Sequence, residues 1–507
     1  MSFGRRLLIP LLHRWEGLLG RRFDIGTPST SIKTASIAQI GSKVINVAVQ
    51  LGITMVLARL LTPAEYGTVA VLTVFSSLFS ILADAGISTA IAQSQDLDET
   101  DYDRLFFLSF LIGVVLAAGF FLLCFGIAWF YGNPIYVPLG AVMALAVILN
   151  ALNMVPNGVL IKERKFKLIG LRLIVCTVVV GAIAIVLAFL GFGCYAIVLN
   201  TVLTSLFVLL WNLVGSHLRM SIGDIRGVYR KVGSFSIYSL GNGIIGWFAS
   251  NADSLIVGKL FGASTLGYYN KAYNLYSYPL GILTNPITDT ILPFLAPLQG
   301  DKDALRNRFI GVFRKISFIS SLCMAWMNVC SAEIILIMYG DTWAPAIPML
   351  AILAFAVYSR GVNGAFSALL NATGRPDLLM RSTAINTVVT VCMIFLGGVM
   401  GSVQSLATCV AIAYNIEMVL PIYFCAHYSL EMGVWRFFAH FLPDLGAAIL
   451  AIVIAALIPW GAWNPFLLLI LKTALVMVVM FAVKAFIDKL VYREDIGIKS
   501  LKNLFGR

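Results

Sequence analysis

Apolar segments of membrane-spanning length dominate this chain and limit what it can fold into. We find about fourteen of them, each roughly 20 residues or longer and able to cross a hydrocarbon core of about 30 Å as a helix. Of all residues, 60% are hydrophobic and only 12% are charged, whereas a soluble protein has about a quarter charged residues. Open sheet edges cannot be satisfied in lipid, and alternation with a period of two is absent, so the segments are helices rather than barrel strands. The sequence therefore predicts an all-α integral membrane protein with about 14 transmembrane helices.

A short stretch occurs twice and indicates an internal repeat. Residues 58–67 and 258–267 both contain a cation, two apolar residues, a break and a closing glycine. Downstream, the run from Phe130 to Asn133 is echoed by the run from Met338 to Asp341. Two halves of six helices each, with a common ancestor, explain this repetition.

The apolar segments then divide the chain into regions. We expect a basic interfacial segment (1–33), an N-terminal lobe (34–214), a cytoplasmic linker (215–232), a C-terminal lobe (233–427), an extra helix pair (443–487) and a cytoplasmic tail (488–507). The expected spans are 36–58, 67–91, 105–131, 136–161, 168–190, 193–214, 233–258, 270–296, 310–339, 344–371, 379–401, 403–427, 443–463 and 465–487. Leucines near helical spacing among arginines favour an interfacial helix in the first segment, with a solvated basic tail as the alternative.

The distribution of lysine and arginine predicts the orientation. Basic residues in short loops stay on the cytoplasmic side. With the N-terminus inside, the cytoplasmic loops are 94–104, 162–167, 215–231 and 297–309. Apart from 94–104, which is acidic, these loops and the adjoining start of the span 310–339 hold most of the cations, and the opposite loops hold only Arg59 and Lys259. Both termini are thus predicted to be cytoplasmic. The net charge of +12 then marks a face next to anionic lipid, and no soluble basic domain is present for nucleic acid.

The cysteines and histidines predict no metal or nucleophilic centre. All eight cysteines lie within apolar spans without paired CxxC spacing, and the four histidines are scattered at helix ends. Such cysteines are small core residues. We therefore expect no metal, no catalytic triad and no cofactor, apart from coupling to a proton gradient, a sodium gradient or the membrane potential.

Ionisable residues inside the spans are the main candidate functional residues. They are Lys43, Asp84, Asp253, Asp289, Glu333, Arg360, Glu417 and Lys472. Each costs about 2.5 to 3.5 kcal/mol near the bilayer centre, so a buried partner, a water-filled path or a substrate must compensate. Lys43, Arg360 and Glu417 have the weakest structural explanation, whereas hydration at a helix end is an alternative for Asp84 and Asp289. Arg360, with Asn363 one turn later, either faces a cavity, where its guanidinium suits pyrophosphate or a sugar carboxylate, or pairs with Glu417 as a structural lock.

Tyrosines are concentrated at the start of the eighth expected span. They are Tyr268, Tyr269, Tyr273, Tyr276 and Tyr278. An interfacial aromatic belt is one explanation. The other is an exit path for sugar, lined by tyrosines such as Tyr273 with Asn270, Lys271 and Asn274, since aromatic rings stack on sugar faces and amides bond hydroxyls.

Several motifs in this order resemble those of a known family. They are the Leu57–Leu61 turn with Tyr66 and Gly67, Asp84 to Ile87, Lys259 to Ala263, Gly267 to Asn274, Asn285 to Ile287 with Leu292 and Pro293, Tyr339 to Trp343 before Pro348, and Arg360 with Asn363 and Gly364. On this pattern the chain resembles the Wzx-type polysaccharide flippases of the multidrug/oligosaccharidyl-lipid/polysaccharide (MOP) superfamily. It is especially similar to colanic acid and lipopolysaccharide exporters.

The resemblance implies a fold and a cargo. It implies two pseudo-symmetric six-helix lobes of the MATE-like type, with an extra C-terminal helix pair and a cavity that opens alternately to either side. The cargo would be an oligosaccharide on undecaprenyl pyrophosphate, moved to the periplasmic leaflet of a bacterial inner membrane. Implied partners are membrane lipids, a polysaccharide polymerase and a chain-length regulator, with no nucleic acid and no enzymatic activity.

Two alternatives stay open. A cation-coupled multidrug exporter of the same superfamily shares the twelve-helix core, but it usually lacks the extra helix pair and basic termini. An integral-membrane polysaccharide polymerase or ligase needs a sizeable outer loop to hold an active site, and every expected outer loop here is only a few residues long.

Overall fold

The computed structural model is helical throughout the part of the chain that it describes. That part comprises residues 32–84, 87–88, 91, 97–216, 218, 220–221, 225–281, 291, 294–461 and 463–491, and for 32–44 and 225–240 the backbone alone is described. No strand occurs in these ranges. The predicted interfacial segment 1–33 and the tail 488–507 lie almost wholly outside the described residues.

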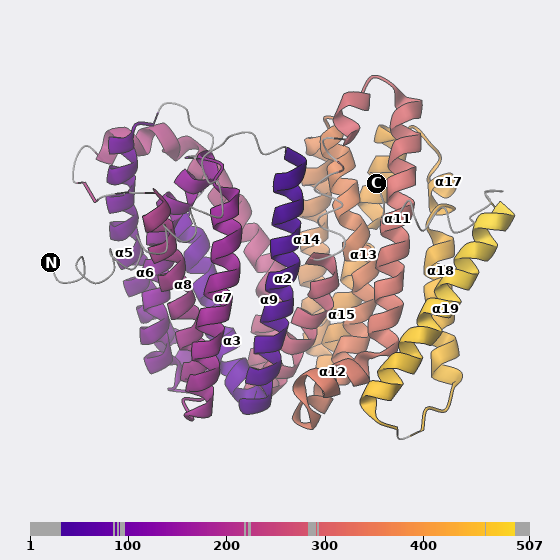
Figure 1. Cartoon of the computed structure of the whole chain (residues 1–507), viewed down its shortest axis with the longest axis horizontal. Coiled ribbons are helices and arrows are strands. Elements are labelled where there is room, and N and C mark those ends of the chain that lie inside the picture. The colour runs from indigo at the N-terminus through magenta and orange to yellow at the C-terminus, as the bar shows by residue number, and fades with distance from the viewer. Residues whose placement is uncertain are drawn as a thin grey trace.

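Six helices of the N-terminal lobe stand together on the left of Figure 1. They are α2 (Ile32–Leu60), α3 (Pro63–Asp84), α5 (Glu99–Tyr131), α6 (Tyr136–Lys162), α7 (Phe166–Phe189) and α8 (Cys194–Ser216). Of these, α2 lies nearest the middle of the molecule in this view.

The C-terminal lobe begins with a long helical element that contains two helices. In α9 (Ile225–Pro279), Gly262 has φ 84° and ψ 172° and separates the two. Because this φ is one that only glycine adopts readily, Gly262 is the break expected from the second repeat stretch. The rest of the lobe contains η2 (Ala296–Leu298), α11 (Lys302–Val329), α12 (Ser331–Tyr339), η3 (Asp341–Ala346), α13 (Ile347–Ala372), α14 (Pro376–Val399), α15 (Val403–Ile416), α16 (Val419–Phe424) and the π-helical turn η4 (Cys425–Ser429).

A final helix pair lies beyond this lobe, in yellow at the right edge of Figure 1. After the short α17 (Val434–Phe438) come α18 (Leu442–Leu457) and α19 (Pro465–Val491). Buried ion pairs join the pair internally and to the lobe. Lys484 Nζ lies 2.9 Å from Asp444 Oδ1 on α18, and Lys472 Nζ lies 2.7 Å from Glu333 Oε1 on α12.

The described helices support the membrane assignment. Ten segments are long and apolar enough to cross a membrane, and two further apolar helices, Ile45–Leu60 and Leu442–Leu457, are shorter. Large apolar side chains such as Val115 and Trp129 are exposed on the outside of α5, as expected for a surface in contact with lipid. The all-α, two-lobed membrane fold is thus confirmed, while the count of fourteen spans stays a prediction.

Helix boundaries differ from the predicted spans in two ways. First, α9 is already helical at Ile225, whereas the apolar run predicts a start near 233, because helical hydrogen bonds do not require apolar side chains. Second, two predicted spans are interrupted. The segment 310–339 is divided at Cys330 into α11 and α12, and 403–427 contains α15, α16 and η4.

Local sequence explains the first repeated turn. Thr62 and Glu65 form a capping box at the start of α3, in which Glu65 Oε2 accepts from the Thr62 backbone N–H at 2.7 Å. Pro63 occupies the first helical position, where its missing N–H is not needed.

The lobes meet along α3 and α9. Trp247 on α9 donates from Nε1 to the Val74 carbonyl at 3.0 Å and to Ser77 Oγ at 2.9 Å, both on α3. We call the end of the molecule that holds Arg59, Lys259 and Tyr339 the outer end, following the predicted orientation. The opposite end is called the inner end.

Candidate functional site

A charged side chain, Arg360, lies in the middle of α13. It is 13 residues from the first residue of that helix and 12 from the last, so roughly 20 Å of helix separates it from either end. Its side chain is nevertheless 38% exposed. A cation at this depth requires an anion, water or a cargo group beside it.

Glu417 lies opposite Arg360, at an interruption between α15 and α16. Pro421 has no N–H to bond the carbonyl of the residue four positions earlier, which is Glu417. Asn386 of α14 supplies the missing hydrogen bond, because its Nδ2 donates to the Glu417 carbonyl at 2.8 Å. Thr390, one turn further along α14, donates from Oγ1 to Glu417 Oε1 at 2.8 Å. Two α14 side chains therefore position Glu417 independently of Arg360.

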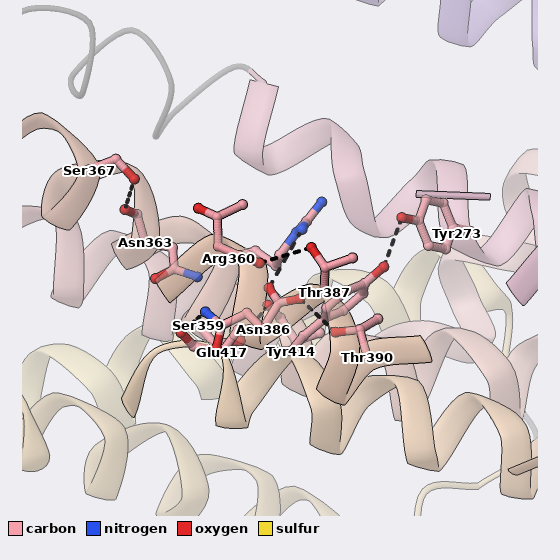
Figure 2. Close-up of polar contacts among 12 residues, drawn as sticks. Tyr273, Ser359, Arg360, Asn363, Ser367, Asn386, Thr387, Thr390, Tyr414 and Glu417 are labelled. Carbon is pink, nitrogen blue, oxygen red and sulfur yellow. Dashed lines mark hydrogen bonds and ion pairs between the residues drawn. The ribbon is translucent and has the colours of Figure 1, made fainter. Parts of the chain in front are cut away.

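Tyrosines from α9 and α15 surround the Arg360 guanidinium. Its Cζ lies 4.6 Å from the ring centroid of Tyr414, a cation–π geometry. The hydroxyl oxygens of Tyr414 and Tyr273 are 3.1 Å apart, and the rings of Tyr273 and Tyr276 meet edge to face at 4.8 Å. Figure 2 shows Arg360, Glu417, Tyr414 and Tyr273 gathered in one cluster.

The guanidinium of Arg360 has N–H donors that no described residue accepts. Its Nη1 is 3.9 Å from Glu417 Oε2, which is an ion pair but too long for a hydrogen bond. Within the described residues, Arg360 donates no side-chain hydrogen bond. Guanidinium groups present five N–H donors in a fixed fork that matches phosphate and carboxylate oxygens. The cluster can therefore bind an anion without first breaking a bidentate hydrogen bond between Arg360 and another residue of the protein.

The other predicted site residues are dispersed. Asn363 lies three residues after Arg360 and is half-buried, and its carbonyl accepts from Ser367. Asn274, next to Tyr273, is exposed and bonds Asn270 at 2.9 Å instead of joining the cluster. Asp84 ends α3, where its Oδ1 accepts from the Ser88 N–H at 3.2 Å, as a helix-end residue does. The Lys43 side chain and Asp289 lie outside the described residues.

The first comparison with known proteins is to a family model. Residues 56–348 match the model described as "Polysaccharide biosynthesis protein", which is more than half of the chain. The chain belongs to this polysaccharide biosynthesis protein family.

Curated relatives agree with that membership. The chain is 25% identical to the lipopolysaccharide biosynthesis protein WzxC of Escherichia coli (strain K12), over 77% of this chain and 81% of the relative. It is 22% identical to the succinoglycan biosynthesis transport protein ExoT of Rhizobium meliloti (strain 1021), over 74% of this chain and 77% of that protein. The predicted resemblance to Wzx-type proteins is confirmed.

Solved structures show the same fold. A lipid II flippase MurJ, described as inward closed, superposes with a TM-score of 0.71 at 13% identity and covers 91% of this chain and 100% of its own. An inward-facing multidrug resistance MATE family transporter of the MOP superfamily gives a TM-score of 0.57 at 16% identity, with 84% and 100% covered. At these identities the similarity concerns the fold alone.

Several residues that lie in or near the Arg360 cluster were not identified from the sequence. Tyr414 lies three residues before Glu417 and hence on the same helix face, a spacing that could have indicated it. Thr390 and Asn386 carry no signal in the sequence, because threonine and asparagine are unremarkable in a membrane helix. Asp253 appeared as an intramembrane charge, and the structure buries it against Tyr269, whose hydroxyl donates at 2.6 Å.

A second intramembrane arginine was also missed. Arg172 of α7 donates from Nη1 to Asn212 Oδ1 at 2.6 Å and to Asn157 Oδ1 at 3.1 Å, while Asn212 bonds Asn153 at 2.7 Å. These residues connect α6, α7 and α8 near the inner end. Asn153 and Asn157 are four positions apart on one helix face, which is the signal that could have revealed the network. Since both contacts of Arg172 are internal, we assign it to packing of the N-terminal lobe.

No metal centre is found in the part of the chain that the structure describes. Its histidines, cysteines and acidic residues form no group of three that could hold an ion.

Proposed function

We propose that this protein is a flippase that moves an oligosaccharide carried on undecaprenyl pyrophosphate from the cytoplasmic to the periplasmic leaflet. Its curated relatives are named for lipopolysaccharide and succinoglycan biosynthesis, and one is named a transport protein. A solved structure with the same fold is a lipid II flippase. Together these support transport of a lipid-linked sugar precursor over chemistry on it.

Physical considerations support the same function. Transfer of sugar hydroxyls and a pyrophosphate through hydrocarbon would leave polar groups without hydrogen-bonding partners, and each such group costs several kcal/mol of free energy. A path between two rocking lobes, related by an axis along the membrane normal, would provide hydrogen-bonding partners while the prenyl chain stays in lipid.

The observation that supports this function most directly is the Arg360 side chain, 38% exposed in the middle of α13. It stacks on Tyr414, has only a long ion pair to Glu417, and lies near the half-buried Tyr273, whose ring can stack on a sugar. We assign Arg360 to the pyrophosphate or to an acidic sugar of the cargo. Tyr273 is then the aromatic surface beside it, the buried Tyr414 holds the guanidinium in place, and Glu417 limits how tightly the anion is held, so that the cargo can leave.

The finer assignments belong to this proposal. The protein is placed in a bacterial inner membrane with both termini cytoplasmic, and it delivers the repeat unit to a polymerase and chain-length regulator. It carries no enzymatic activity of its own. A proton gradient, a sodium gradient or the membrane potential drives the cycle.

Two measurements test the proposal. Deletion of the gene should cause the lipid-linked repeat unit to accumulate, and its extraction identifies the cargo. The purified protein in liposomes should carry a labelled prenyl-pyrophosphate oligosaccharide to the opposite leaflet, whereas protein-free liposomes should not. Cation-driven export of drugs without sugar-lipid movement would instead identify a multidrug exporter, and chain extension of the sugar would identify a polymerase. Either result contradicts the proposal.

A further inference from the structure

Two exposed cations reach across the lobe boundary at the outer end. Arg59 of the N-terminal lobe donates from Nη2 to the carbonyl of Ile337, at the end of α12, at 2.6 Å. Lys259 of the C-terminal lobe donates from Nζ to the carbonyl of Phe130, at the end of α5. Arg59 and Lys259 occupy the same position in the two repeat stretches. They are also the two cations that the sequence places on the outer side.

Each cation therefore binds the C-terminus of a helix in the other lobe. The last carbonyls of a helix have no partner within it, and they carry the negative end of the helix dipole. The two acceptors lie near equivalent points of the repeat, since Phe130 is one residue before the Tyr131-Gly132 turn that ends α5 and Ile337 is two residues before the Tyr339-Gly340 turn that ends α12. The contact is reciprocal, because each lobe supplies one cation and one helix end.

Glycines at the same place bring the two backbones together. A Cβ atom built on Gly67 would lie 1.7 Å from the carbonyl oxygen of Ala263, and one built on Gly267 would lie 2.0 Å from that of Pro63. Residues 63 and 263 are equivalent in the repeat, as are 67 and 267. Any side chain at either glycine would force the lobes apart in this arrangement.

Aromatic groups add a second set of contacts between the lobes. Trp343 donates from Nε1 to the Ala58 carbonyl at 2.8 Å, and the Tyr131 hydroxyl donates to the Leu255 carbonyl at 3.2 Å. Lys271 of the C-terminal lobe is buried, with its Nζ 3.6 Å from the ring centroid of Tyr66 in the N-terminal lobe. Within the described residues the structure gives this ammonium group no ion pair or hydrogen bond.

We propose that Arg59 and Lys259 are a matched pair of gate residues that hold the outer end closed and must both be released before cargo can leave on that side. The acceptors are carbonyls of helix ends, so the contacts are strong enough to keep a closed state populated. Being exposed, they are also weak enough to break in each cycle. This inference rests on the proposed transport function, but it concerns the lobe contact and not the Arg360 cluster.

Labelling of an introduced cysteine tests the gate without any cargo. Val71 of α3 is buried at the lobe contact, with a methyl carbon 3.6 Å from the Cβ position of Gly258, and Leu139 of α6 is buried inside the N-terminal lobe. Purified Val71→Cys protein in nanodiscs would be treated with a maleimide, and occupancy at position 71 would be read by peptide mass spectrometry. Leu139→Cys serves as the reporter of unfolding.

The double substitution Arg59→Gln with Lys259→Gln should raise the labelling rate at position 71 by about threefold or more, because two charge-assisted hydrogen bonds are lost. The charge-conserving variant Arg59→Lys with Lys259→Arg should be labelled at position 71 as slowly as Val71→Cys protein without it. Arg308 is an exposed cation at the inner end, and Arg308→Gln should leave the labelling rate at position 71 unchanged. Gly67→Ala should also raise the labelling rate at position 71, since the added Cβ atom would push the lobes apart. Unchanged labelling in the Gln pair or in Gly67→Ala overturns the proposal, as does an equal rise at position 139.

Discussion

At the scale of single residues, Arg360 combines both interpretations that the sequence left open. The ion pair with Glu417 exists, but at 3.9 Å it does not occupy the donors of the guanidinium. Asn386 bonds the backbone carbonyl of Glu417 and Thr390 bonds its carboxylate, so Glu417 is positioned without the arginine. The geometry therefore favours a binding role over a purely structural lock.

Substitution of Arg360 by lysine separates these roles, since lysine keeps the charge but lacks the planar fork. We expect Arg360→Lys to be made at normal levels and to flip the labelled sugar lipid about tenfold more slowly, as for loss of one charge-assisted hydrogen bond. Adding Glu417→Gln should not restore transport. If Arg360→Ala is degraded while Arg360→Ala with Glu417→Gln transports normally, Arg360 is only a lock and its assignment to cargo fails.

At the scale of elements, α19 depends on charged contacts for its position. Its outward surface faces lipid, and packing of apolar groups against lipid tails and against protein differs little in free energy. Lys472 and Glu333, 12% and 5% exposed, therefore fix where α19 meets α12. Trp326 of α11 adds a hydrogen bond to Thr473 Oγ1 at 2.9 Å.

Removing one partner of this pair should destabilise the protein more than removing both. Lys472→Met leaves the Glu333 carboxylate buried and unpaired, which costs about 3 to 5 kcal/mol for a buried pair. We expect a clear fall in the thermal unfolding temperature in detergent. The double variant Lys472→Met with Glu333→Leu should recover most of the loss, and equal destabilisation by both variants would show that α19 is held by other contacts.

At the scale of the whole molecule, the ends of the bundle differ in charge. At the inner end the described cations include Lys162, Arg164, Lys165, Lys302, Arg306 and Arg308. Of these, Lys165 bonds the Gly215 carbonyl at 2.9 Å and Lys302 pairs with Glu431 at 2.8 Å. At the outer end, Arg59 and Lys259 bind helix ends of the opposite lobe. This asymmetry is what the positive-inside rule uses to orient a chain.

Reporter fusions check the orientation directly. A periplasm-active phosphatase fused after Lys165 should be silent, and the same enzyme fused after Trp460, between α18 and α19, should be active. A cytoplasm-active reporter at the two sites is the matched control and should give the opposite pattern. Activity after Lys165 with silence after Trp460 would reverse the orientation and the direction of transport.

The sequence alone determined the class of fold, because apolar segments long enough to span lipid have few alternatives to the helix. It also determined the repeat, through the cations and glycines of residues 58–67 and 258–267, and the candidate Arg360, through the cost of a charge within a span. The helix interruptions could be predicted only in part from the sequence. Pro421 marks a break, but the position of Glu417 depends on Asn386, which bonds the freed Glu417 carbonyl from another helix.

Only the tertiary structure decided which of the charged and polar residues meet. Tyr273, Arg360, Thr390 and Glu417 come from four different elements, and no local pattern encodes their approach, which results from how α9, α13, α14 and α15 pack. For the same reason, the sequence showed Arg59 and Lys259 as isolated loop cations. Their partners, the carbonyls of Ile337 and Phe130, are backbone atoms of the opposite lobe, and backbone atoms leave no mark on the sequence.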